Sequence, residues 1–153
     1  MMKISRRLNT PQLCAAAAAL SFLADRISKG SLALFGCRAH FNGGISFGLF
    51  SGAGAAVTGF SAGAAAALVV AAFALLRRRE SDKLFSCGLG LAIGGALGNS
   101  ADRLLFGCVK DWIFVPFSHL VLKGGLWINI ADISLCAGAA VVVLDLLRAA
   151  KRG

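Results

Sequence analysis

Four long apolar stretches, separated by short polar segments, divide the chain. Their approximate ranges are residues 8–27, 55–76, 84–106 and 126–147, and the second stretch contains no charged residue. A transmembrane helix needs about 20 mostly apolar residues, so each stretch is long enough, or nearly so, to cross a bilayer. Alanine runs at 15–19 and 64–67 favour helix over strand. The pattern predicts an all-α membrane protein with four transmembrane helices in a single domain, residues 1–153.

The composition agrees with a membrane protein. Of 153 residues, 58% are hydrophobic and only 15% are charged, against about 25% charged residues in a typical soluble domain. A disordered chain needs low hydrophobicity and high charge, so that class is excluded. A soluble domain of this size has too little interior to hide so much apolar surface.

The basic residues indicate the orientation in the membrane. The net charge is +9, and the lysines and arginines cluster before the first stretch, between the second and third, and after the fourth. Cytoplasmic loops are enriched in such residues. We therefore expect both termini to be cytoplasmic, with 30–54 and 107–125 on the outer side, where 30–54 would form a small strand-containing extracytoplasmic cap. Nucleic-acid binders usually interleave basic and aromatic residues on one face, so no nucleic acid is expected.

Small residues suggest how the helices pack. Gly59 and Gly63, and likewise Gly90, Gly94 and Gly98, have the small-xxx-small spacing that lets membrane helices approach closely. The five cysteines have no C-x-x-C spacing, and no His/Cys cluster has the spacing of zinc ligands. We expect no metal and no cofactor, and a monomer surrounded by lipid.

The seven acidic residues fall into two groups. Glu80, Asp82 and Asp145 map to the cytoplasmic side, whereas four others map to the outer ends of the predicted helices: Asp25, Asp102, Asp111 and Asp132. Carboxylates within membrane segments are expensive and are candidates for function. Each could instead cap a helix or reach the interface, and a helix N-terminus would favour a carboxylate such as Asp132 in any case.

Asp111 and Asp132 form the best candidate pair, because they lie at the mouths of adjacent spans joined by one outer loop. Two close carboxylates share a proton, so one can activate water while the other protonates a carbonyl oxygen. Asn129 is three residues before Asp132 and shares its helix face. Asn99, Asp102 and Arg103 form a polar stripe in the third stretch, in which we interpret Asp102 as an ion-paired or structural acid.

Two other classes of function remain possible from the residues alone. Acids within helices also serve proton or ion pathways, but a pathway should carry carboxylates through the full membrane depth, and the first two stretches have none in their inner halves. A helix bundle with only a structural role is the other class, and its acids should tolerate replacement by asparagine.

Five short blocks carry a resemblance to a known family. In order they are Asp25 to Lys29, Asn42 to Phe47 (Asn-x-Gly-x-x-Phe), Gly98 to Arg103 (Gly-Asn-x-x-Asp-Arg), Val109 to Trp112, and Ile128 to Asp132. With these blocks on four spans, the chain resembles lipoprotein signal peptidase, also called signal peptidase II, over almost its whole length. The departures are mild, since Trp112 and Ile128 stand where the family commonly has phenylalanine.

The resemblance implies an intramembrane aspartic endopeptidase of the bacterial cytoplasmic (inner) membrane, with its active site facing the outer side. It implies Asp111 and Asp132 as the catalytic dyad, and a substrate site lined by Asn42, Gly44, Asn99, Arg103 and Asn129. It also implies supporting roles for Asp25, Lys29 and Asp102. The implied partner is a bacterial prolipoprotein with a diacylglyceryl cysteine, which is cut just before that cysteine to remove the signal peptide.

Overall fold

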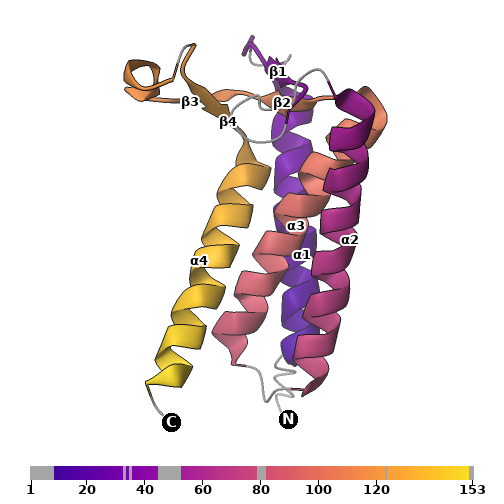
Figure 1. Ribbon diagram of the computed structural model, residues 1–153, viewed down its shortest axis with the longest axis vertical. Coiled ribbons are helices and arrows are strands. Elements are labelled where there is room, and N and C mark those ends of the chain that lie inside the picture. The colour runs from indigo at the N-terminus through magenta and orange to yellow at the C-terminus, as the bar shows by residue number, and fades with distance from the viewer. Residues whose placement is uncertain are drawn as a thin grey trace, which may run out of the picture.

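Four helices form a bundle, and the short strands gather at one end of it (Figure 1). The computed structural model describes residues 9–32, 34, 36–44, 53–78, 82–122 and 124–151. Within these residues the helices are α1 (Thr10–Ser31), α2 (Gly54–Arg78), α3 (Lys83–Phe106) and α4 (Ile130–Ala150). The strands are β1 (His40–Asn42), β2 (Val109–Asp111), β3 (Ile113–Val115) and β4 (Leu126–Ile128), and η2 (Ser118–Leu120) is a short 3-10 helix.

Three of the helices are long and apolar enough to cross a membrane, namely α2, α3 and α4. The prediction of a mostly helical membrane protein is therefore confirmed. Helix α1 has 22 residues but is not among these candidates. It carries Asp25, Arg26 and Lys29 in its last two turns, and these charges lower its apolar character.

The fourth apolar stretch is only partly helical, which corrects the predicted start near residue 126. Leu126–Ile128 form β4, which pairs antiparallel with β3, and α4 begins at Ile130. A continuous apolar run does not distinguish a short strand from the first turn of a helix. Antiparallel pairing of β1 with β2 makes a second small sheet. Short strands are therefore observed at this end, but among the described residues only β1 comes from the predicted segment 30–54, and the other three strands lie between 109 and 128. Phe47, the last residue of the Asn-x-Gly-x-x-Phe block, lies outside the described residues.

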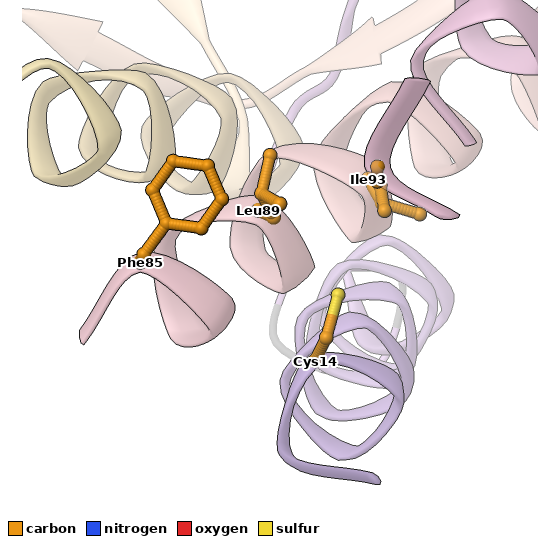
Figure 2. Close-up of a cluster of buried hydrophobic side chains, with 5 residues drawn as sticks. Cys14, Phe85, Leu89 and Ile93 are labelled. Carbon is orange, nitrogen blue, oxygen red and sulfur yellow. The ribbon is translucent and has the colours of Figure 1, made fainter. Parts of the chain in front are cut away.

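Helix α3 is the centre of the bundle and contacts all three other helices. Figure 2 shows Phe85, Leu89 and Ile93 of α3 together with Cys14 of α1 in a buried apolar cluster, which also includes Ala72 of α2. The three α3 residues are four positions apart and therefore share one helix face. Cys14 therefore acts as a small hydrophobic side chain.

Glycines allow α3 to lie close to its neighbours. A Cβ atom on Gly90 would lie 2.3 Å from the carbonyl oxygen of Cys14, and one on Gly94 would lie 2.5 Å from that of Ala18. The predicted role of the α3 glycines in close packing is confirmed. For Gly59 and Gly63 of α2 the same prediction is wrong, because no described atom lies within 4 Å of the corresponding positions.

Candidate active site

The polar residues of the candidate site meet at the strand-bearing end of the bundle, between α3, β2 and α4. Helix α3 ends at Phe106 and is capped by Gly107, which adopts a left-handed conformation (φ 73°) and donates its N–H to the carbonyl of Arg103 at 2.9 Å. Glycine tolerates this conformation because it has no Cβ. The turn leads directly into β2, whose last residue, Asp111, lies opposite His40 of β1.

A reciprocal pair of hydrogen bonds forms the N-terminus of α4. The Asn129 side-chain oxygen accepts from the Asp132 backbone N–H at 2.9 Å, and Asp132 Oδ2 accepts from the Asn129 backbone N–H at 3.1 Å. This arrangement is a capping box, which satisfies backbone groups that have no partner within the helix. The Asn-x-x-Asp spacing in the sequence thus places Asp132 in the first turn of α4 with a fixed orientation.

Two asparagine side chains connect the two aspartates. Asn129 Nδ2 donates to Asp111 Oδ1 at 2.6 Å and to Asn99 Oδ1 at 3.1 Å, while Asn99 Nδ2 donates to Asp132 Oδ1 at 2.7 Å. Asn42 of β1 donates to the other oxygen of Asp111 at 3.2 Å. The structure therefore brings Asp111, Asp132 and three of the predicted asparagines into one hydrogen-bonded cluster.

Asp111 has an unusual protonation equilibrium. Burial of its carboxyl group and the nearby negative charge of Asp132 raise the pKa of Asp111 to about 6, although hydrogen bonds from Asn129 and Asn42 and the positive charge of Lys29 act in the opposite direction. A carboxyl group with this pKa gains and loses its proton between mildly acidic and neutral pH. A carboxylic acid beside a carboxylate provides the acid and the base that hydrolysis of an amide requires.

Arg103 forms one wall of the site. Its Nη2 donates to the Gly44 carbonyl at 2.8 Å, and its Nη1 donates to Ser61 Oγ at 3.3 Å. The Gly44 N–H in turn donates to the Asn42 side chain at 3.0 Å, so Arg103, Gly44 and Asn42 form a connected group. Sequence reasoning missed Ser61, whose only signal was a hydroxyl group in an otherwise apolar stretch.

A buried ion network lies directly beneath the site. Lys29 Nζ is 2.9 Å from Asp25 Oδ1 and 2.9 Å from Asp102 Oδ2, and Arg26 bridges the same two carboxylates at 2.6 and 2.7 Å. The interpretation of Asp102 as an ion-paired acid is confirmed, and its partners come from α1. Sequence reasoning did not assign Arg26 to the site, although its position between Asp25 and Lys29 was a signal.

The ion network contacts both α4 and the asparagine cluster. Asp25 Oδ1 accepts the backbone N–H of Ala131 at 3.1 Å, so a carboxylate of α1 contributes to the cap of α4. Lys29 Nζ donates to Asn99 Oδ1 at 3.4 Å, and Asp102 Oδ2 accepts the Lys110 N–H at 3.1 Å. Asp25 thus contacts α4, which carries Asp132, and Asp102 contacts β2, which carries Asp111. Lys29 contacts Asn99, which donates to Asp132.

Among the described residues, no group of three or more histidine, cysteine, aspartate or glutamate side chains is arranged to hold a metal ion. The chemistry available from these residues is that of the carboxyl pair, its amide donors and Arg103.

Comparisons with known proteins show that the chain is similar to bacterial signal peptidases. A family model described as signal peptidase (SPase) II matches residues 12–148. A lipoprotein signal peptidase of Ralstonia nicotianae is 38% identical over 114 residues, which cover 73% of this chain and 63% of that protein. One of Rhodopseudomonas palustris is 39% identical over 112 residues, covering 70% and 65%. The aligned parts are thus less than two thirds of these relatives. A solved bacterial membrane enzyme shares the fold, with a TM-score of 0.71 and 23% identity over 88% of this chain and 87% of that one.

Proposed function

The chain belongs to the signal peptidase II family, and from this premise we propose that it is an aspartic endopeptidase that processes bacterial prolipoproteins. It removes the signal peptide from a precursor that carries diacylglycerol on its cysteine, and it cuts the peptide bond just before that cysteine. The observation that carries the proposal is the link from Asp111 through Asn129 and Asn99 to Asp132. This link keeps two carboxyl groups in one polar cluster at the end of apolar helices.

The reaction needs only these two groups and a water molecule. One carboxylate removes a proton from the water, whose oxygen forms a bond to the carbonyl carbon, while the other carboxyl group protonates the carbonyl oxygen. The C–N bond of the tetrahedral intermediate then breaks as the carboxyl group that took the water proton gives it to the cysteine nitrogen. The other carboxylate takes a hydroxyl proton back from the intermediate, which restores the starting protonation of the pair. A protonated Asp111, with its pKa of about 6, suits the second role.

The remaining polar residues divide into two roles. Both polar atoms of the Asn99 side chain are engaged by Lys29, Asn129 and Asp132. We therefore assign Asn99 and Asn129 to the orientation of the carboxyl groups. Arg103, Gly44 and Asn42 form the wall that binds the substrate backbone. Arg103 Nε is buried and has no acceptor among the described residues, so it can donate to a peptide carbonyl of the precursor.

The proposed placement is a bacterial inner-membrane protein with four spans, including α1, and with cytoplasmic termini. The side chains of Asp25 and Lys29 near the end of α1 are buried and pair within the bundle, so lipid does not contact these two charges directly. In Figure 1 the first turn of α1 and the last turn of α4 lie at the end of the bundle opposite the strands. Arg148 and Lys151 lie near that end of α4, as positive-inside orientation requires. The active site then faces the outer side, and the protein acts as a monomer in lipid without nucleic acid.

The positions of the acids support a peptidase over a proton pathway. Asp25, Asp102, Asp111 and Asp132 lie together at the strand-bearing end. Among the described residues, only Asp82 and Asp145 are acidic elsewhere, and they lie toward the opposite end of α3 and α4. A pathway needs groups spaced through the membrane depth.

A cleavage assay tests the proposal. The purified protein is mixed with a precursor whose cysteine is diacylglyceryl-modified and with the same precursor lacking the lipid. We expect cleavage only of the lipidated form, and Asp111→Asn and Asp132→Asn should each abolish it. Asp145→Asn is the matched control and should retain cleavage. Near-normal activity of either dyad variant, with unfolding unchanged, contradicts the assignment.

A further inference from the structure

A hairpin projects sideways from the bundle at the strand-bearing end. It consists of β3, η2 and β4, residues 113–128, and we call it the hairpin arm. Figure 1 shows it leaving the top of α4 and extending beyond that helix, away from α1, α2 and α3. The four helices of the bundle therefore do not cover the tip of the arm.

The tip of the hairpin arm is apolar and exposed. Phe117 is 73% exposed, Leu120 is 74% exposed and Val121 is 86% exposed. The sequence of the arm contains no acidic residue and only one lysine. An exposed apolar patch outside the helices usually marks an interaction surface. The scarcity of charge argues against a partner that is recognised by electrostatic attraction.

Local hydrogen bonds hold the tip in a defined shape. Ser118 Oγ donates to the Val115 carbonyl at 2.6 Å and accepts the Leu126 N–H at 2.7 Å, which ties the two strands together. The N–H groups of Leu120 and Val121 donate to carbonyls within the same turn. A backbone that satisfies its own polar groups can approach hydrocarbon at low cost. Phe117 has a φ of 62°, a left-handed conformation that is rare for a bulky residue.

Aromatic rings connect the arm to the rest of the cap. Phe114 and Trp127 lie 5.1 Å apart between ring centroids, and Trp127 stacks on His40 at 6.1 Å. His40 is the β1 residue that lies opposite Asp111. Tryptophan and other amphipathic rings concentrate where membrane proteins meet the lipid headgroups. The position of the arm is thus coupled to the strand pair that carries Asp111.

We propose that the hairpin arm docks on the membrane leaflet next to the strand-bearing end, with Phe117, Leu120 and Val121 inserted among the lipids. Lipid is the occupant because the arm runs sideways from the end of a bundle of apolar helices, over the leaflet beside α4 (Figure 1), and its exposed tip is apolar and nearly free of charge. The docked arm sets the height of β1 and β2 relative to the bilayer. This inference goes beyond the proposed function, since it requires only that the bundle lies in a membrane.

Tryptophan fluorescence in vesicles tests the docking. Leu120→Trp places an indole at the tip, Leu144→Trp places one on the exposed face of α4, and the parent protein supplies the background of Trp112 and Trp127. The vesicles contain phosphatidylethanolamine and phosphatidylglycerol, with or without bromine on the upper acyl chains. We expect brominated lipid to quench the added emission of Leu120→Trp to an extent comparable with that of Leu144→Trp. Added emission that stays red-shifted and is not quenched overturns the proposal.

A second variant separates lipid docking from other uses of the tip. In Leu120→Trp protein, Phe117→Ser and Val121→Ser should each shift the docking equilibrium away from lipid by roughly tenfold, because each removes a large apolar side chain. Quenching should therefore fall while the unfolding midpoint in detergent stays unchanged. If these serine variants leave quenching unchanged, or if the tip is protected only at high protein concentration as in self-association, the proposal is wrong. Because quenching does not depend on cleavage, the result is independent of the proposed activity.

Discussion

Replacing Asn129 with alanine tests whether its side chain does more than cap α4. Asn129 is fully buried, and it caps α4 through the backbone N–H of Asp132. It also donates to Asp111 at 2.6 Å and to Asn99 at 3.1 Å. The alanine variant removes all of these contacts and leaves the Asp111 carboxyl group with one side-chain donor fewer.

The expected loss of stability follows from the two roles of Asn129. Loss of an N-cap costs about 1 kcal/mol. Loss of a hydrogen bond to a charged group costs a further amount of about 1.5–3 kcal/mol. We therefore expect the free energy of unfolding to fall by about 3 kcal/mol in Asn129→Ala.

The chain offers a matched control in Asn9. Asn9 caps α1 with the same reciprocal pattern, accepting the Gln12 N–H at 3.0 Å and donating its own N–H to the Gln12 side chain at 3.1 Å. It is exposed, and its side chain caps no helix that carries a dyad residue. Asn9→Ala should therefore cost only about 1 kcal/mol. The difference between the two variants isolates the contribution of the contacts with Asp111 and Asn99.

Denaturant unfolding in detergent micelles and the pH dependence of cleavage provide the two measurements. Asn129 stabilises the charged form of Asp111, so its removal should raise the pKa of Asp111 further above about 6. The alkaline limb of kcat/KM should then move to higher pH in Asn129→Ala, and cleavage should fall. Asn9→Ala should leave the pH profile unchanged. Equal destabilisation by the two variants, with identical pH profiles, would refute the reasoning.

Three further changes have defined outcomes. Because burial raises the pKa of Asp111 above its unfolded value of about 3.9, the folded state binds the proton more tightly. Stability should fall as the pH rises from about 4 through 6, and unfolding of Asp111→Asn should lose this component. Lys29→Met leaves a buried carboxylate pair with only Arg26 and should cost about 3–5 kcal/mol in denaturant unfolding, whereas Lys110→Met, whose ammonium lies over the Phe106 ring, should cost about 1 kcal/mol or less. Gly94→Ala should lower the melting temperature, because its Cβ would lie 2.5 Å from a backbone oxygen, whereas Gly63→Ala enters open space and should not.

Helix positions and the placement of Asp111 and Asp132 in one cluster were predictable from the sequence because both depend on order along the chain. Long apolar stretches must be helical in lipid, since each backbone group needs a partner within its own segment. Asp111 and Asp132 follow one another across a single loop, so topology alone places them at the same end of the bundle. The same reasoning failed at Leu126–Ile128, where an apolar run forms a strand because β3 offers a partner.

Contacts between elements were not predictable, because they depend on helix rotation and on distances of a few ångströms. The sequence does not show that Asp25 of α1 accepts the N–H of Ala131 at the start of α4. That contact requires α1 and α4 to meet beside Gly98 of α3, where a Cβ atom would lie 2.8 Å from Asp25 Oδ2 and 3.1 Å from Ala131 Cβ. Ser61 was missed for the same reason, since its role depends on the position of Arg103 beside α2.

The buried ion network orients the candidate dyad through one amide group. Asn99 Oδ1 accepts from Lys29 Nζ and from Asn129 Nδ2, both of which can only donate. If the amide were reversed, its NH₂ group would face these two donors and its oxygen would face the Asp132 carboxylate. Lys29 therefore fixes the direction in which Asn99 donates, and Asp132 receives that hydrogen bond. Asp25 and Asp102 each hold the Lys29 ammonium at 2.9 Å, so these three residues determine the hydrogen-bond direction at the candidate dyad without a hydrogen bond to either of its carboxyl groups.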